Sequence, residues 1–209
     1  MTLLGQAAIA MWWDIAPAQQ AEFEHWHSHE HFPERLSIPG FRRGTRWKSA
    51  SGGEGYFVVY ELEAYETLTS PHYLARLNDP TPWSRKMMPH HRNMVRSQCR
   101  VMASFGAGVS GHALTLRFSP ASDAALKTLA AALGELPTRP GIAGAHLLHT
   151  QTPPATQTAE QRIRGGDAAA DWIVLVSGYD REALAALELL PAARRDLFRL
   201  SHTLAKADL

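Results

Sequence analysis

Residues 24–41 read EHWHSHEHFPERLSIPGF, a stretch that joins the end of a predicted helix to the start of a predicted strand. We expect the helix over residues 17–32, because Pro33 disfavours the α conformation of the residue before it. Pro39-Gly40-Phe41 is typical of a turn that leads into a strand. This junction fixes the order of the elements on either side of it.

The rest of the first half follows the order β-α-β-β-α-β. An apolar run precedes the quoted stretch, and Gly52-Gly53 after it marks a hairpin between two strands. Residues 80–89 are rich in proline, and we expect them to form a loop. The predicted elements are a strand at 5–15, a helix at 17–32, strands at 41–47 and 56–62, a helix at 66–79 and a strand at 95–105.

The second half repeats this order after Gly111. Pro140-Gly141-Ile142 occupies the place that Pro39-Gly40-Phe41 has in the first half. Residues 150–170 are rich in Pro, Gln, Thr, Gly and Ala, which predicts a long, mobile loop. The predicted elements are a strand at 113–118, a helix at 122–136, a strand beginning at 142, a strand at 172–176, a helix at 181–190 and a strand at 196–204.

The repeated order predicts an α+β fold of two tandem ferredoxin-like units, at residues 1–108 and 109–209. Each unit would form a four-stranded antiparallel sheet with helices on one face. The bare faces are expected to pack together within one chain or across a homodimer, so that dimerisation is optional. A cleft between the two sheets is then the expected pocket for a small-molecule ligand.

Composition narrows the classes of partner. The 209 residues contain 21 Lys+Arg and 20 Asp+Glu, a balance that does not favour nucleic-acid binding. The single cysteine, Cys99, cannot form an intramolecular disulfide, and the N-terminus lacks the pattern of a secretory signal. No apolar window approaches the length of a membrane span, about 18 residues. We therefore expect a cytoplasmic protein with neither a nucleic-acid nor a membrane partner.

The run from Glu24 to Leu36, followed by Pro39-Gly40-Phe41, resembles the first-helix signature of the dimeric α+β barrel superfamily, particularly its EthD-like members. The segment Asp79-Pro80-Thr81-Pro82-Trp83 also resembles a recurrent segment of such proteins. The resemblance implies paired ferredoxin-like units. It also implies one of several activities: isomerase, polyketide cyclase, cofactor-free monooxygenase or tandem haem enzyme. The second half has no Trp-x-x-x-Glu-His element, so the first half is expected to hold the site.

The predicted catalytic residues are His27, Glu30 and His31. At about 100° per residue, His27 and Glu30 fall on the apolar face of the helix, and His31 lies at its border. A buried carboxylate costs several kcal/mol unless it is paired, so we expect Glu30 to pair with an imidazole as one acid–base cluster facing the cleft. The alternative is a structural hydrogen bond from Glu30 to Tyr56 or Tyr60.

The predicted ligand-binding residues are Trp26, Tyr56, Tyr60, Trp83 and His90. The last two lie in the proline-rich loop, which could close over the cleft as a lid. The alternative is that this loop covers one end of the core. The spacing of His27 and His31 suits two metal ligands, but the signal is weak, and neither a metal nor another cofactor is part of the prediction.

The sequence therefore favours a small-molecule enzyme that transfers protons: an isomerase, a cyclase or a cofactor-free monooxygenase. Two alternatives stay open. One is a small-molecule binding protein without catalysis, and the other is a haem protein with one histidine of the cleft as axial ligand.

Overall fold

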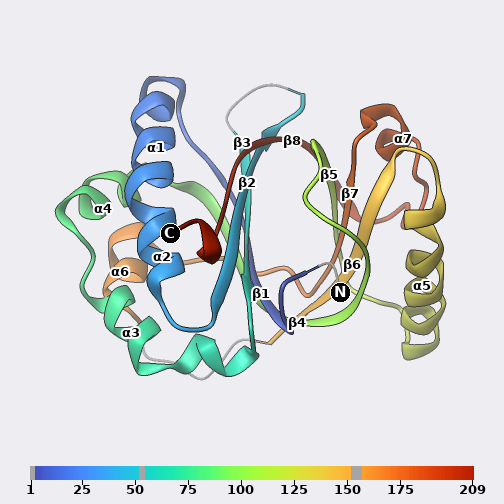
Figure 1. Cartoon of the computed structure of the whole chain (residues 1–209), viewed down its shortest axis with the longest axis horizontal. Coiled ribbons are helices and arrows are strands. Elements are labelled where there is room, and N and C mark those ends of the chain that lie inside the picture. The colour runs from blue at the N-terminus through green and yellow to red at the C-terminus, as the bar shows by residue number, and fades with distance from the viewer. Residues whose placement is uncertain (1–2, 52–54, 152–156) are drawn as a thin grey trace.

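A computed structural model describes residues 3–51, 55–151 and 157–209. Its core is a barrel, and helices lie on two opposite sides of it (Figure 1). In the part of the chain that the structure describes, the strands are β1 (Ala7–Asp14), β2 (Phe41–Ser49), β3 (Gly55–Leu62), β4 (Arg92–Gly106), β5 (His112–Phe118), β6 (Ile142–Thr150), β7 (Trp172–Gly178) and β8 (Arg194–Ala205).

The barrel is closed, with the strand order β1-β3-β2-β8-β5-β7-β6-β4. Each half contributes the same arrangement, β4-β1-β3-β2 from the first and β8-β5-β7-β6 from the second, which confirms the tandem ferredoxin-like fold. The two seams form because β4 and β8 are long. Strand β4 pairs first with β1 and then, from Cys99 onward, with β6, while β8 pairs first with β5 and then with β2.

Side chains fill the middle of the barrel, so the cleft expected between the two sheets does not run through it, and space between them remains at one end of the barrel. Trp12, Phe57 and Trp47 form a stack, with ring centroids 4.9 and 5.3 Å apart. Phe198 of β8 packs against Phe57 at 5.5 Å. An eight-stranded barrel is just wide enough for side chains to fill it. The helices therefore pack on its outer surface, and the histidine-rich helix faces that surface instead of the interior.

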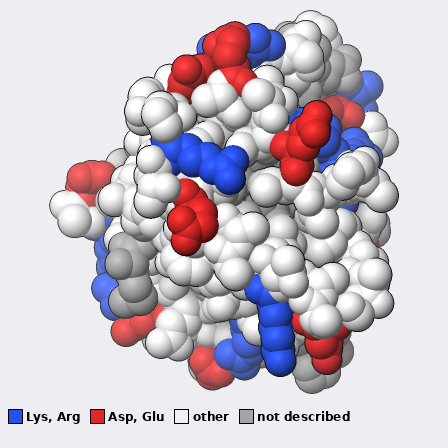
Figure 2. Space-filling view, turned by 90° about the vertical axis from the view of Figure 1, so that its right-hand side faces the viewer, with Lys and Arg blue, Asp and Glu red and all other residues white. Residues whose placement is uncertain are grey.

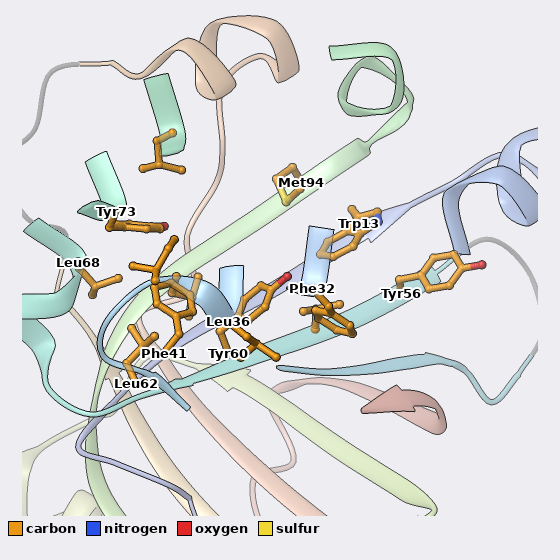
Figure 3. Close-up of a cluster of buried hydrophobic side chains, with 14 of the residues drawn as sticks. Trp13, Phe32, Leu36, Phe41, Tyr56, Tyr60, Leu62, Leu68, Tyr73 and Met94 are labelled. Carbon is orange, nitrogen blue, oxygen red and sulfur yellow. The ribbon is translucent and has the colours of Figure 1, made fainter. Parts of the chain in front are cut away.

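Two outer layers cover the barrel, one for each half. The first-half layer is rich in aromatic side chains, including Trp13, Phe32 and Tyr60 (Figure 3). The second-half layer is aliphatic, with Leu129 and Leu133 as typical members. The described helices are α1 (Gln20–Trp26), α2 (Phe32–Ser37), α3 (Pro71–Asn78), α4 (Pro82–Met87), α5 (Asp123–Glu135), α6 (Ala159–Arg164) and α7 (Arg181–Ala185), with 3₁₀ turns at Pro17–Gln19, Tyr65–Thr69, Met88–His90, Leu136–Thr138 and Lys206–Asp208.

The helix expected to end before Pro33 continues to Ser37 through a π-helical turn, His27–His31. The Phe32 amide donates to the His27 carbonyl five residues earlier, which is the π-helical hydrogen bond. A proline ring clashes with the carbonyl four residues before it, and it has no N–H to donate. The wider turn immediately before Pro33 accommodates that ring. The prediction missed this because a 3.6-residue period was assumed throughout.

Four other segments differ from their predictions. The helix expected at 66–79 is a 3₁₀ turn followed by α3, because Pro71 starts a new helix with Ser70 as its N-cap. The loop expected at 80–89 is α4 and a 3₁₀ turn. The mobile loop expected at 150–170 contains α6, capped by Thr158, while 152–156 lie outside the described residues. The helix expected at 181–190 is the five-residue α7.

The surface over α5 and α7 carries both signs of charge. Figure 2 shows Lys and Arg interspersed with Asp and Glu on this side of the molecule, separated by uncharged residues. This pattern agrees with a formal net charge of +1 for the chain. Among the described residues, no helix has the length and hydrophobicity of a membrane span.

Gly44 of β2 provides a test of how closely the helices approach the barrel. A Cβ at this position would lie 2.8 Å from Phe32 Cε1 and 2.9 Å from Tyr60 Cε1. Both rings are fully buried and have no room to move. Gly44→Ala should therefore lower the free energy of unfolding by about 1–3 kcal/mol in urea denaturation.

Gly55 of β3 is the matched control, since the nearest atom to its added Cβ would be at 3.6 Å, an ordinary contact. Gly55→Ala should leave stability nearly unchanged. Equal losses for the two variants would contradict the close packing of Phe32 on the barrel.

Candidate functional site

A small cavity, which we call the helix-side cavity, lies between the outer face of the barrel and the helices of the first half. Its volume is about 40 Å³, compared with about 10–15 Å³ for one water molecule. Apolar side chains of β1, β4 and the helices form much of its wall. The lining residues are Ile9, Met11, Trp13, Trp26, His27, His31, Arg35, Tyr60, Tyr73, Leu77, Met88, His91, Met94, Arg96, Glu160 and Arg164.

The π-helical turn brings His27 and His31 to this cavity. Their ring centroids are 5.3 Å apart, and the two side chains are almost completely buried. Burial lowers the pKa of both imidazoles well below 6.5, and nearby positive groups add to the effect: Arg46 at His27 and Arg35 at His31. Both rings are therefore neutral at pH 7. Neutral rings also differ from the pairing of an imidazole with the Glu30 carboxylate that we expected from the sequence.

His91 is a third cavity histidine, and the sequence analysis missed it. It directly follows the 3₁₀ turn Met88–His90, and its ring centroid lies 5.1 Å from that of Trp13. Burial and the charge of Arg164 lower its pKa to about 3. The neighbouring residue His90, which was predicted to bind ligand, is not part of the cavity lining. The 3₁₀ turn Met88–His90 decides which of the two histidines faces the cavity. Because we predicted a loop here, the sequence did not show whether His90 or His91 would do so.

A buried ion pair joins the two halves at the cavity. Arg35 of α2 binds Glu160 of α6, and both side chains are at least 95% buried. Burial opposes the charge on Arg35, but the carboxylates of Glu160 and Glu34 outweigh that cost and raise its pKa. Helix α6 belongs to the second half and lies within residues 150–170, which we expected to form a loop. The second half therefore contributes Glu160 to a site that is otherwise built mainly by the first half.

Polar atoms without a partner converge on this cavity. Within the described part of the chain, five buried atoms of the lining have no hydrogen-bond partner in the protein. An unsatisfied buried polar group typically costs about 1–3 kcal/mol, so such groups concentrated at one place are typical of a binding site. These atoms are Trp13 Nε1, His27 Nδ1, His31 Nδ1, Arg35 Nη1 and Tyr60 OH.

Glu30 is not paired with an imidazole. It accepts hydrogen bonds from Thr81 Oγ1 at 2.6 Å and from Trp26 Nε1 at 3.1 Å. It therefore joins the π-helical turn to the start of α4. The alternative partners were also wrong, because Tyr56 donates to Glu24 at 2.7 Å and the Tyr60 hydroxyl has no partner among the described residues.

The other predicted ligand-binding residues divide between cavity and periphery. Trp26 and Tyr60 line the cavity, whereas Tyr56 and Trp83 do not. Trp83 packs on the first-half core and lies 5.2 Å from the exposed ring of His25. In residues 3–51, 55–151 and 157–209, no group of three or more His, Cys, Asp or Glu side chains is placed to hold a metal ion.

Structural comparison identifies the fold. An anthrone oxidase-like protein aligns over 100% of this chain and 98% of its own, with a TM-score of 0.64 and 10% identity. A proposed monooxygenase from Fusobacterium nucleatum aligns over 97% and 96%, with a TM-score of 0.62 and 6% identity. A proposed monooxygenase from Lactobacillus acidophilus aligns over 96% and 97%, with a TM-score of 0.60 and 9% identity.

A proposed chlorite dismutase also aligns, over 95% of this chain and 96% of its own, with a TM-score of 0.52 and 11% identity. No protein-family model matches the sequence, and no curated protein matches it significantly. The chain has the fold of the dimeric α+β barrel superfamily, with both units in one polypeptide.

Glu30→Gln tests whether Glu30 supports the fold by holding α4. The substitution keeps the shape of the side chain but removes the charge that strengthens the hydrogen bonds from Thr81 and Trp26. We expect the free energy of unfolding to fall by about 1–3 kcal/mol in urea denaturation.

Glu22→Gln is the matched control, because Glu22 joins the same two helices through an exposed ion pair with Lys86. Exposed pairs contribute little to stability. A Glu30→Gln protein as stable as the wild type would show that the carboxylate does not hold α4.

Proposed function

We propose that this protein is a small-molecule enzyme in which His27 or His31 removes a proton from an apolar, carbonyl-containing substrate bound in the helix-side cavity. The observation that carries the proposal is that five buried polar atoms without a hydrogen bond, as found among the described residues, belong to the lining of one cavity. Because folding leaves these atoms unsatisfied, the cost of burying them supports a role in ligand binding.

The neutral imidazoles supply the base. A histidine accepts a proton only when its ring is uncharged, and burial lowers the pKa of His27 and His31 enough to keep them so. The Nδ1 atoms of both rings have no hydrogen bond within the described residues, although His31 Nδ1 lies 3.7 Å from Glu34 Oε2, so each leaves a position that a substrate could use. Because burial disfavours the imidazolium, the proton on the imidazole either returns to the substrate, at the carbon or at the oxyanion, or passes to solvent water.

The hydrogen-bond donors at the cavity suit the charge that proton removal creates. Loss of a proton next to a carbonyl places negative charge on the carbonyl oxygen. Arg35 Nη1 and the Tyr60 hydroxyl are unpartnered donors on the same lining. Preorganised donors at a developing oxyanion commonly supply the largest single part of an enzyme's rate acceleration. We assign the oxyanion position to these two groups.

The walls favour an aromatic substrate. Trp13 and Trp26 present ring surfaces, and Met88 and Met94 provide flexible apolar contacts. At about 40 Å³ the cavity must enlarge before such a molecule can enter. The short helix α6 is the element that we expect to move. For this the Arg35–Glu160 ion pair with α2 and the hydrogen bond from the Ala159 amide to Asn78 Oδ1 of α3 would both have to break.

A haem does not fit this site. The cavity is far smaller than typical ligand pockets, which measure about 300–1,000 Å³. Phe32 lies 4.4 Å from the His27 ring and Trp26 lies 4.6 Å from the His31 ring, measured between centroids. A macrocycle would require these buried aromatic rings to repack, so we derive no step through haem.

Anthrone is a suitable probe, because it is an aromatic ketone with an acidic methylene group, and one structure with this fold is described as anthrone oxidase-like. Under nitrogen in deuterated buffer, the protein should accelerate exchange of the methylene protons, as measured by proton NMR. His27→Phe and His31→Phe each remove a base while keeping an aromatic ring. At least one should reduce the enzymatic exchange rate by about 10²–10⁴-fold.

The melting temperatures of both variants should stay close to that of the wild type, since neither Nδ1 atom has a hydrogen bond to lose. His29→Gln, on the exposed side of the same turn, should keep full activity. Binding of anthrone without accelerated exchange would instead indicate a binding protein. Exchange that survives the double variant His27→Phe/His31→Phe would exclude these residues as the base.

A further inference from the structure

A second, larger cavity opens at one end of the barrel, where β1 and β5 end and where β4 and β8 begin. Its volume is about 730 Å³, within the range of small-molecule pockets, about 300–1,000 Å³. We call it the barrel mouth. Its floor is the aromatic core of the barrel, including Trp12 and Phe198. The predicted enzyme activity uses none of the charged groups that line it.

Arg117 is the central charged group of the barrel mouth. It lies on β5 two residues after Thr115, whose hydroxyl accepts a hydrogen bond from Trp12 Nε1 inside the barrel. Its guanidinium carbon lies 4.6 Å from the centre of the Trp12 ring, so the side chain also points inward. Arg117 as a whole is 9% exposed.

One nitrogen of this buried guanidinium has a hydrogen-bond partner and another has none within the described residues. Arg117 Nη2 donates to Asp196 Oδ2 at 2.7 Å, whereas Nε has no partner among the described residues. A buried arginine N–H without a partner is costly, and it is the type of group that completes its hydrogen bonding with a ligand anion. Burial lowers the pKa of Arg117, but Asp196 opposes this shift, so the side chain stays charged.

The surrounding charges favour an anion of low charge. Among the residues that the structure describes, four arginines line the mouth, Arg117, Arg181, Arg194 and Arg195, against two aspartates, Asp14 and Asp196. Arg195 is held outside the barrel by the carbonyls of Leu184, Ala185 and Leu187. Arg194 is largely exposed, with its Nε 3.6 Å from Asp196, so it can turn toward a ligand at the rim.

We propose that the barrel mouth binds a small organic carboxylate with an apolar or aromatic body. One carboxylate oxygen would accept from Arg117 Nε, and the body would lie against Val95 and Phe198. The planar guanidinium suits a planar carboxylate. A phosphate dianion fits less well, because Asp14 and Asp196 also face the mouth and would repel a second negative charge.

Benzoate is the probe, and inorganic phosphate is its comparison. In two-dimensional ¹H–¹⁵N NMR spectra, benzoate should shift the Trp12 indole signal and the backbone amides near Arg117 and Asp196 in a saturable manner. Phosphate at the same concentration should shift them at least tenfold more weakly. Shifts that are confined to the helix-side cavity, that are equal for the two anions or that do not saturate would overturn the proposal.

Arg117→Lys keeps a positive charge beside Asp196 but lacks the Nε donor, and it should weaken benzoate binding by about 10–100-fold. Arg194→Gln, at the exposed rim, should weaken binding by a smaller factor and provides a second test if Arg117→Lys fails to fold. Arg199→Gln is the control, since Arg199 is exposed on the same strand and does not line the mouth. Unchanged affinity in both Arg117→Lys and Arg194→Gln would exclude this site.

Discussion

Closure of the barrel is the constraint on which the rest of the structure depends. Strands β4 and β8 each pair with both halves, so the two sheets become one cylinder with a filled interior. A ligand cannot lie between the sheets in the middle of the barrel, because side chains fill the cleft that the sequence pattern suggested there. The remaining places for a ligand are the layers between helices and barrel and the two open ends. The helix-side cavity occupies the first kind of place and the barrel mouth the second.

The two halves share a topology but not a chemistry. The outer layer of the second half is mainly aliphatic, with leucine, valine and isoleucine side chains and Trp172. The first-half layer instead contains histidines, tyrosines and a buried arginine around a small cavity. The second half still takes part, because α6 crosses over to place Glu160 against Arg35. The candidate site therefore requires the whole chain, although nearly all of its lining comes from one half.

Local patterns predicted the strands and helix α5 well, because their alternation, apolar stripes and turn residues act over a few residues. Helical spacing also placed His27 and His31 on or beside the apolar face of their helix, but the space they line is outside the barrel and not the expected cleft between the sheets. The π-helical turn could not be predicted from helical spacing, because it depends on how the widened backbone accommodates Pro33. Glu30 binds Thr81, which lies 51 residues further along the chain. Arg35 binds Glu160, which lies 125 residues further along and completes the site. Contacts at such separations follow from the closed barrel, and no spacing in the sequence encodes them.

The central claim is that the helix-side cavity keeps its histidines neutral. An NMR pH titration of the imidazole signals tests it most directly, with each signal assigned by its loss in the corresponding histidine-to-phenylalanine variant. Because burial lowers the pKa of His27 and His31, both rings should stay neutral as the pH falls through 6.5, and His91 should stay neutral toward pH 3 for as long as the protein is folded. Protonation of His27 and His31 at or above pH 6.5 in the folded protein would contradict the account.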